Sequence, residues 1–80
     1  MKAVILLRTN PGFQKEAYTA LQRITKAPPS GAANMVVSHV FGRFDGVVTC
    51  DCTDSRTLNA LGEALRSEGV FYTETLIAID

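Results

Sequence analysis

The sequence is poor in the residues that build metal centres and disulfide frameworks. Its 80 residues contain one histidine, two cysteines and no tryptophan. A zinc site takes several cysteine, histidine or carboxylate ligands, and His39 is the only histidine. Cys50 and Cys52 point to the same face of a predicted strand, where residues at this spacing diverge too far for a mutual disulfide. We therefore expect no metal and no cofactor, and we expect both thiols to act as small buried hydrophobic groups in a reducing compartment.

The sequence also lacks an excess of either charge. Eight basic and eight acidic residues give a net charge of zero. The basic residues form no cluster along the chain: Lys2, Arg8, Lys15, Arg23, Lys26, Arg43, Arg56 and Arg66. Binding of phosphates requires concentrated lysine and arginine, so we expect no direct binding of nucleic acid.

No apolar run approaches the ~20 residues that span a bilayer. The apolar segment at the start of the chain is too short for a signal sequence and lacks a cleavage site. These features predict a cytoplasmic protein that does not bind membranes.

What the sequence does have is a high hydrophobic content for its length. A chain this short buries only about 60% of the surface that its unfolded form exposes. Yet 46% of its residues are hydrophobic. We expect one domain over residues 1–80, and we expect the surplus apolar surface to be covered by self-association.

The hydrophobic pattern predicts strands and helices in the order strand-helix-strand-strand-helix-strand. The predicted elements are a strand over 2–9, a helix from Asn10-Pro11-Gly12 to Lys26, strands over 35–41 and 47–52, a helix that begins at one of 53–55 and stops before Gly69, and a strand over 70–79. Asn10 is the expected N-cap of the first helix, and Gly69 is expected to end the second in a left-handed conformation. Residues 27–34 are predicted to form a loop.

With right-handed crossovers this order predicts the ferredoxin-like α+β fold, a four-stranded antiparallel sheet with both helices on one face. The first and third strands become the central pair. The first and last strands are apolar on both sides, so the face without helices is expected to form a dimer interface. Aspartate at Ile5 or Leu7 is accordingly expected to give monomers or insoluble protein.

Two polar segments stand out against this framework. Residues 41–46 place glycines, aromatics and opposite charges at the tip of the predicted hairpin, and residues 69–75 lead from a helix end into a strand with hydroxyl side chains. Neither segment has the composition of a catalytic site. Both fit a small oligomeric domain whose polar turn holds a small molecule.

The motifs occur in order and at consistent spacing along the whole chain. They are Asn10-Pro11-Gly12, Gly42-Arg43-Phe44-Asp45, Asp54, Gly69-Val70 and Thr73-Glu74-Thr75. In this arrangement the chain resembles the effector-binding domain of Lrp/AsnC-type (leucine-responsive, feast/famine) transcription regulators. Those regulators carry an N-terminal helix-turn-helix domain, whereas here the first predicted strand begins at residue 2. We therefore expect a stand-alone form of the sensing domain.

The resemblance implies dimers packed through their sheets, larger assemblies of dimers, and amino-acid effectors bound between dimers near the hairpin turn. The ligand-binding residues it implies are Gly42, Arg43, Phe44, Asp45, Thr73 and Thr75. Backbone N–H groups in a glycine-containing turn suit a carboxylate, and Asp45 suits an ammonium. Structural roles are the alternative: Gly42 and Gly46 permit the turn, Asp45 hydrogen-bonds its own backbone, and both threonines favour a strand.

Three functions are compatible with these residues. The first is a non-enzymatic, oligomeric amino-acid sensor that modulates full-length Lrp/AsnC-type regulators by co-assembly. The second is a small dimeric enzyme of the monooxygenase or isomerase type, with His39 or Asp51 as acid or base. The third is a purely structural assembly module. Catalysis needs convergent titratable groups, which are scarce here, so we expect no catalytic residues. We expect His39 to be packed, and Asp51 to pair with a cation of another subunit.

Overall fold

Strand β1 (Lys2–Thr9) lies in the middle of the sheet, and its burial alternates along the chain. The computed structural model describes residues 1–67 and 69–79. Ala3, Ile5 and Leu7 are completely buried, whereas Val4 and Leu6 are half-buried. Since alternate residues of a strand point to opposite faces, one face of the sheet is fully covered and the other is not.

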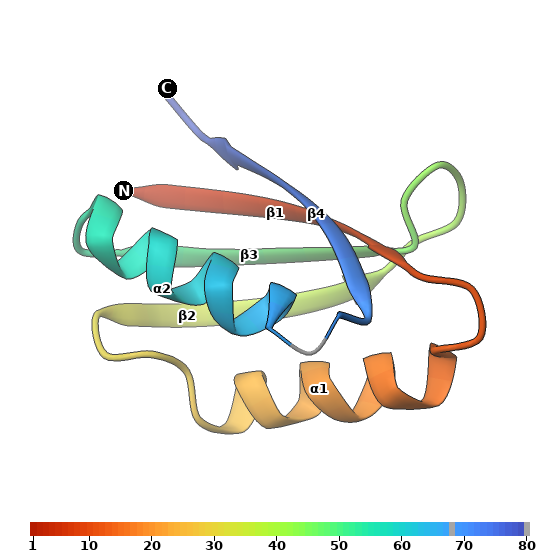
Figure 1. Ribbon diagram of the computed structural model, residues 1–80. Helices are drawn as coiled ribbons and strands as arrows, with labels where there is room; N and C mark the ends of the chain where they lie inside the picture. Colours follow the sequence, from red (N-terminus) through yellow and green to blue (C-terminus); the bar gives the residue numbers. More distant parts are fainter. Residues whose placement is uncertain (68, 80) are drawn as a thin grey trace.

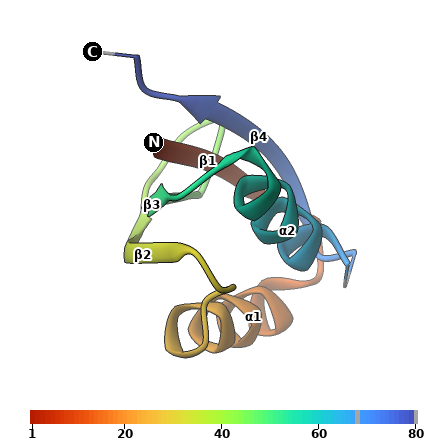
Figure 2. The same ribbon diagram turned by 90° about the vertical axis from the view of Figure 1, so that its left-hand side faces the viewer.

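The predicted ferredoxin-like fold is confirmed. Four strands form one antiparallel sheet in the order β2-β3-β1-β4, so the first and third strands are central as expected. The remaining elements are α1 (Gln14–Lys26), β2 (Ala32–His39), β3 (Gly46–Cys52), α2 (Ser55–Arg66) and β4 (Phe71–Ile77) (Figure 1). Figure 2 shows both helices on the concave side of the curved sheet. Neither helix in the described part of the chain is long and apolar enough to cross a membrane.

One hydrophobic core lies between the sheet and the helices. It combines the inward residues of β1 and β3 with apolar side chains of both helices: Ala17, Ala20, Leu21, Leu58, Leu61 and Leu65. Cys50 and Cys52 belong to this core as free thiols, with their sulfur atoms 3.7 Å apart. The prediction that they act as small buried hydrophobic groups is confirmed.

Burial of Cys50 has a consequence for stability at high pH. Removal from water, together with the hydrogen bond that its thiol makes with Cys52, raises the pKa of Cys50 from 9.0 to about 11. Between these values the unfolded chain has released a proton that the folded chain retains, so raising the pH favours unfolding. The contribution of Cys50 is complete below pH 9 and is lost as the pH rises through 11.

We therefore expect the free energy of unfolding to fall between pH 9 and 10.5, measured by urea titration. One pKa unit corresponds to ~1.4 kcal/mol, so Cys50 accounts for about 2–3 kcal/mol at most. The comparison is with Cys50→Ala, which shares every other titratable side chain and whose slope against pH should be shallower. Parallel slopes for the two proteins would contradict this assignment.

The two helices begin differently. Asp54 caps α2, because its carboxylate accepts hydrogen bonds from the Thr57 backbone N–H at 2.8 Å and from the Thr57 hydroxyl at 2.9 Å. These bonds lower the pKa of Asp54. For α1 the prediction is wrong: the cap position is Phe13, and no side chain caps it. Asn10 instead uses its side-chain amide to hold the carbonyl of Gly69, at 2.8 Å.

Strand β2 begins and ends earlier than predicted. It begins at Ala32, inside the predicted loop, because an irregularity between Ala33 and Val36 lets the strand continue. There Asn34 has a positive φ of 54°, a conformation that asparagine tolerates better than most residues. The strand ends at His39, so Val40 and Phe41 belong to the following loop.

The irregularity in β2 also places Asn34 beside the carboxylate of Asp51 in β3. The Asn34 amide donates to Asp51 at 2.8 Å. Asp51 thus has a partner within its own chain, and its pairing with a cation of another subunit stays a prediction.

The connection from α2 to β4 follows the prediction more closely. Gly69 has a φ of 70° and its N–H donates to the carbonyl of Arg66, the last residue of α2, at 3.0 Å. The last strand spans Phe71–Ile77 and is shorter than the predicted 70–79. Its register places Phe71, Thr73 and Thr75 on the helix side of the sheet.

Candidate functional site

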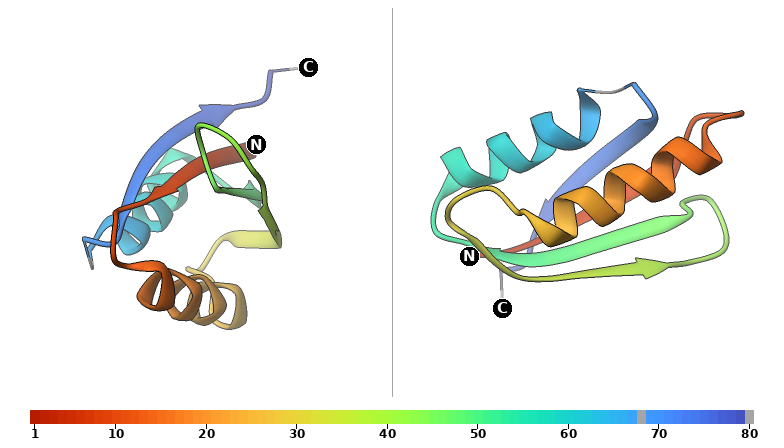
Figure 3. Two further views of the ribbon diagram at one scale, coloured as in Figure 1. Left: turned by 90° about the vertical axis from the view of Figure 1, so that its right-hand side faces the viewer. Right: turned by 90° about the horizontal axis from the view of Figure 1, so that it is seen from below.

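The loop 40–45 joins β2 to β3 and projects beyond the strand ends (Figures 1 and 3). Its base is closed by a hydrogen bond from the Val40 N–H to the Asp45 carbonyl, at 3.2 Å. Gly42 has a φ of 142°, which side chains rarely adopt, and no other atom lies within 4 Å of the position of a Cβ there. Glycine is therefore favoured at this position by its backbone conformation, since there is room for a side chain. The predicted turn thus exists and is open to solvent.

Asp45 fastens this turn to the end of β1. Its backbone N–H donates to the Leu7 carbonyl at 3.0 Å. Both oxygens of its carboxylate accept from the Thr9 N–H, at 3.1 and 3.3 Å, and one lies 3.4 Å from the Thr9 hydroxyl. The side chain is exposed, so its remaining lone pairs are accessible to a cation. Asp45 therefore has a structural partner, Thr9, that differs from the local backbone considered from the sequence.

The other residues of the turn form an aromatic and cationic pair. The guanidinium of Arg43 lies 5.8 Å from the centre of the Phe44 ring. Phe44 is half-buried, whereas Arg43 is exposed. The two side chains thus present a cation over an apolar surface beside the carboxylate of Asp45.

The two threonines lie elsewhere on the sheet. Thr73 is opposite Leu7 on one side of β1, and Gly46 is opposite Leu7 on its other side. Two strand spacings amount to ~10 Å, so β1 separates the threonines from the turn. The Thr73 hydroxyl accepts a hydrogen bond from Arg66 at 3.4 Å. The structure therefore brings 42–45 together and places Thr73 and Thr75 apart from them.

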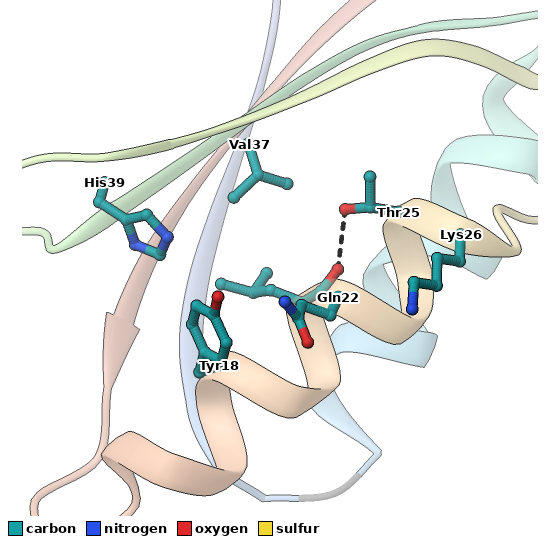
Figure 4. A pocket seen from close by; sticks show the side chains of 7 residues that line it. Tyr18, Gln22, Thr25, Lys26, Val37 and His39 are labelled. Carbon is teal, nitrogen blue, oxygen red and sulfur yellow. Dashed lines mark hydrogen bonds between the residues drawn. The ribbon is translucent and has the colours of Figure 1, made fainter.

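A groove between α1 and β2 was not anticipated from the sequence. It consists of two adjoining hollows of about 330 and 260 Å³ that share Tyr18, Leu21 and His39. We call it the α1–β2 groove. Figure 4 shows the larger hollow, which is lined by Tyr18, Leu21, Gln22, Thr25, Lys26, Val37 and His39. The smaller hollow reaches Thr9 and Asp45, so the groove leads to the base of the turn.

His39 forms part of this groove and is exposed, contrary to the expectation of a packed histidine. Its ring stacks on Tyr18 with the ring centres 6.3 Å apart and an angle of 22° between the planes. The pairing of His39 with Gly46 puts it on the helix side of the sheet. In the sequence, Tyr18 and Gln22 mark one side of α1 as lining this groove. The groove could not be predicted from them, because it forms only where α1 packs beside β2.

The residues considered for acid–base chemistry do not converge. His39 lies on the helix side of the sheet, and Asp51, with Thr49 and Val47, alternates to the opposite side. The sheet therefore separates them. Among residues 1–67 and 69–79, no group of three or more histidine, cysteine or acidic side chains could hold a metal ion.

Comparison with known proteins gives a fold but no family. No protein-family model matches the sequence, and no curated protein matches it. The chain is similar to the crystal structure of FFRP-DM1, with a TM-score of 0.72 and 24% sequence identity. The match covers 98% of this chain and 97% of FFRP-DM1. The ferredoxin-like fold therefore extends over the whole length of both chains.

Proposed function

We propose that this chain is a non-enzymatic, oligomeric sensing domain that binds an amino-acid effector. The observation that carries the proposal is the whole-chain likeness to FFRP-DM1, at a TM-score of 0.72. FFRP stands for feast/famine regulatory protein, the type of regulator that the sequence motifs also resemble. The motif order and the fold thus support the same function.

The proposed effector site is the turn 42–45. An amino acid carries an ammonium beside a carboxylate, and this turn offers an exposed carboxylate at Asp45 next to a glycine-containing backbone. Thr73 and Thr75 lie across β1 from this turn, too far for a small effector to touch both groups in one chain. We propose that the threonines contribute from a neighbouring subunit.

Self-association is proposed to occur through the sheet face that the helices leave uncovered. This open face carries apolar side chains from all four strands: Val4, Leu6, Val36, Val47, Tyr72 and Leu76. Val36 is 55% exposed and Leu76 is 52% exposed. Such a patch fits a second copy of the same sheet, and a full-length Lrp/AsnC-type regulator would offer a related face for co-assembly.

Among residues 1–67 and 69–79, the two groups considered for acid–base chemistry do not converge, which supports a role without catalysis. His39 and Asp51 lie on opposite faces of the sheet, so the monooxygenase or isomerase alternative has no pair of groups around one substrate. The balanced and dispersed charge supports action through protein partners instead of direct contact with nucleic acid.

A thermal-shift screen of the twenty amino acids, followed by native mass spectrometry, tests the proposal. An effector at 100 times its Kd stabilises the fold by ~2.7 kcal/mol, which raises Tm by roughly 10–20 °C in a domain of this size. The D-enantiomer of the effector is the matched control and should give a smaller shift. If no amino acid at 10 mM (roughly 100 times a Kd of 0.1 mM) raises Tm, the chain is better described as a structural assembly module.

A further inference from the structure

We propose that Phe41 of one copy inserts into the α1–β2 groove of another copy, as a second contact between subunits beside the open face. Phe41 and the groove are the two features that the sensing function leaves unexplained. The inference rests on the open-face dimer of the proposed function, but the contact needs no effector, so a failure of effector binding leaves it unaffected.

The first observation is the exposure of Phe41. Its relative exposure is 106%, so its ring makes essentially no contact within the chain. Its neighbour Val40 is 43% exposed. A fully exposed, large aromatic side chain on a projecting loop is unfavourable in water, and aromatic residues are typical anchors of protein interfaces. The loop thus has the form of an apolar knob.

The second observation is the shape and lining of the α1–β2 groove. Its larger hollow of about 330 Å³ lies within the size range of sites that enclose small aromatic ligands. Leu21 and Val37 are its apolar lining residues, and the stacked rings of Tyr18 and His39 lie at one end of it (Figure 4). A phenyl ring placed here would contact aromatic edges and faces, an arrangement that aromatic pairs favour.

The third observation is that the knob cannot reach the groove of its own chain. Phe41 is two residues beyond His39, which itself lines the groove. The pairing of His39 with Gly46 and the bond from Val40 to Asp45 hold the base of the loop in line with the strands. The loop therefore points away from its own groove, so the Phe41 ring can enter this groove only on another molecule.

This geometry defines the type of assembly. Knob and groove are different surfaces, so two chains either exchange knobs reciprocally about a two-fold axis or join head-to-tail into a ring or a filament, and either arrangement links the dimers that the open face forms. A dimer carries two knobs and two grooves and can link to others on both sides. The loop 40–45 is far smaller than the 20–30 residues that one partner contributes to a standard interface. Assembly by this contact should therefore be multivalent and dependent on concentration.

The first test is the mass distribution of the full chain between 1 and 100 µM (roughly the range in which weak multivalent contacts form), by light scattering and native mass spectrometry. We expect assemblies larger than a dimer for the wild type and for Phe41→Leu, which keeps an apolar knob. Phe41→Ser should stop at the dimer, with an unchanged circular dichroism spectrum. Gln22→Trp, which fills the mouth of the groove, should have the same effect as Phe41→Ser.

Cross-linking identifies the surfaces directly. Equimolar Phe41→Cys and Gln22→Cys proteins, mixed and oxidised, should form a mixed disulfide in several-fold excess over a mixture of Phe41→Cys with Asn59→Cys, which places the thiol on α2. Equal cross-linking in the two mixtures, or wild-type masses for Phe41→Ser, overturns the proposal. A wild type that remains a dimer at every concentration also overturns it, and leaves effector binding at the turn unaffected. The proposal is also overturned if a small molecule binds in the groove and the mass distribution of Phe41→Ser equals that of the wild type.

Discussion

Ile5→Asp is expected to prevent folding, whereas Val4→Asp at the adjacent position is expected to leave a folded monomer. Ile5 is completely buried between the sheet and the helices. An unpaired carboxylate there costs several kcal/mol, in addition to the lost apolar contacts, against a total stability of about 5–15 kcal/mol. Val4 is half-buried on the open face between Thr49 and Leu76, where a carboxylate of the monomer still reaches water.

Circular dichroism and light scattering distinguish these outcomes. Val4→Thr is the matched control, because it has nearly the same shape without a charge and should still associate. Val4→Asp should retain the wild-type spectrum and give a mass near 8.6 kDa at micromolar concentration. A protein that carries both Val4→Asp and Phe41→Ser and is still a dimer would show that the open face is not the dimer interface. A folded Ile5→Asp protein would contradict the described core.

The sequence was sufficient to predict the order of the elements, because both helices have a clear hydrophobic period and turn residues separate the strands. Alternation in β3 and the leucine spacing in α2 report directly on which side each element buries. In β1 every residue from Ala3 to Leu7 is apolar, so the sequence could not tell which face meets the helices. The structure resolves this, and it places the predicted aspartate substitutions at Ile5 and Leu7 in the core.

The predictions of helix and strand ends were wrong where a polar side chain forms a hydrogen bond with a residue distant in the sequence. Asn10 has the composition of a helix cap, but its amide bonds Gly69, which is 59 residues away in the sequence. The start of β2 was missed because the strand continues through a bulge at Asn34, which bonds Asp51 of the next strand. Local propensity is informative only while tertiary partners do not compete for the same groups.

In the candidate site, too, the local turn could be predicted from the sequence, whereas its contacts with distant residues could not. Turn residues with glycine and aspartate between two strands predict a hairpin, and the hairpin is present. Asp45 forms its hydrogen bond with Thr9, which lies 36 residues earlier in the sequence. No local sequence pattern predicts that bond. The α1–β2 groove depends equally on the placement of one helix against an edge strand, which is a property of the fold and not of either segment.

Asp45→Asn is expected to weaken binding of the effector by about 1.5–3 kcal/mol, or roughly 10- to 150-fold, with little loss of stability. The asparagine oxygen can still accept the hydrogen bond from the Thr9 N–H, so the end of β1 stays in place. What is lost is the negative charge that would pair with an ammonium. Asp45→Ala removes both functions and should lower affinity and Tm together, because the Thr9 N–H loses its acceptor.

Calorimetric titration with the effector found in the thermal-shift screen, alongside melting curves, separates charge from structure. Asp54→Asn is the matched control: it removes the same charge far from the turn, and asparagine remains a good helix cap. This control should bind like the wild type. If Asp45→Asn also binds like the wild type while Asp45→Ala only melts earlier, then Asp45 braces the end of β1 and the ammonium must be recognised by another carboxylate. A specific loss of affinity in Asp45→Asn, with Tm unchanged, would leave electrostatic recognition at the turn as the explanation, because the hydrogen bond to Thr9 is present in both proteins.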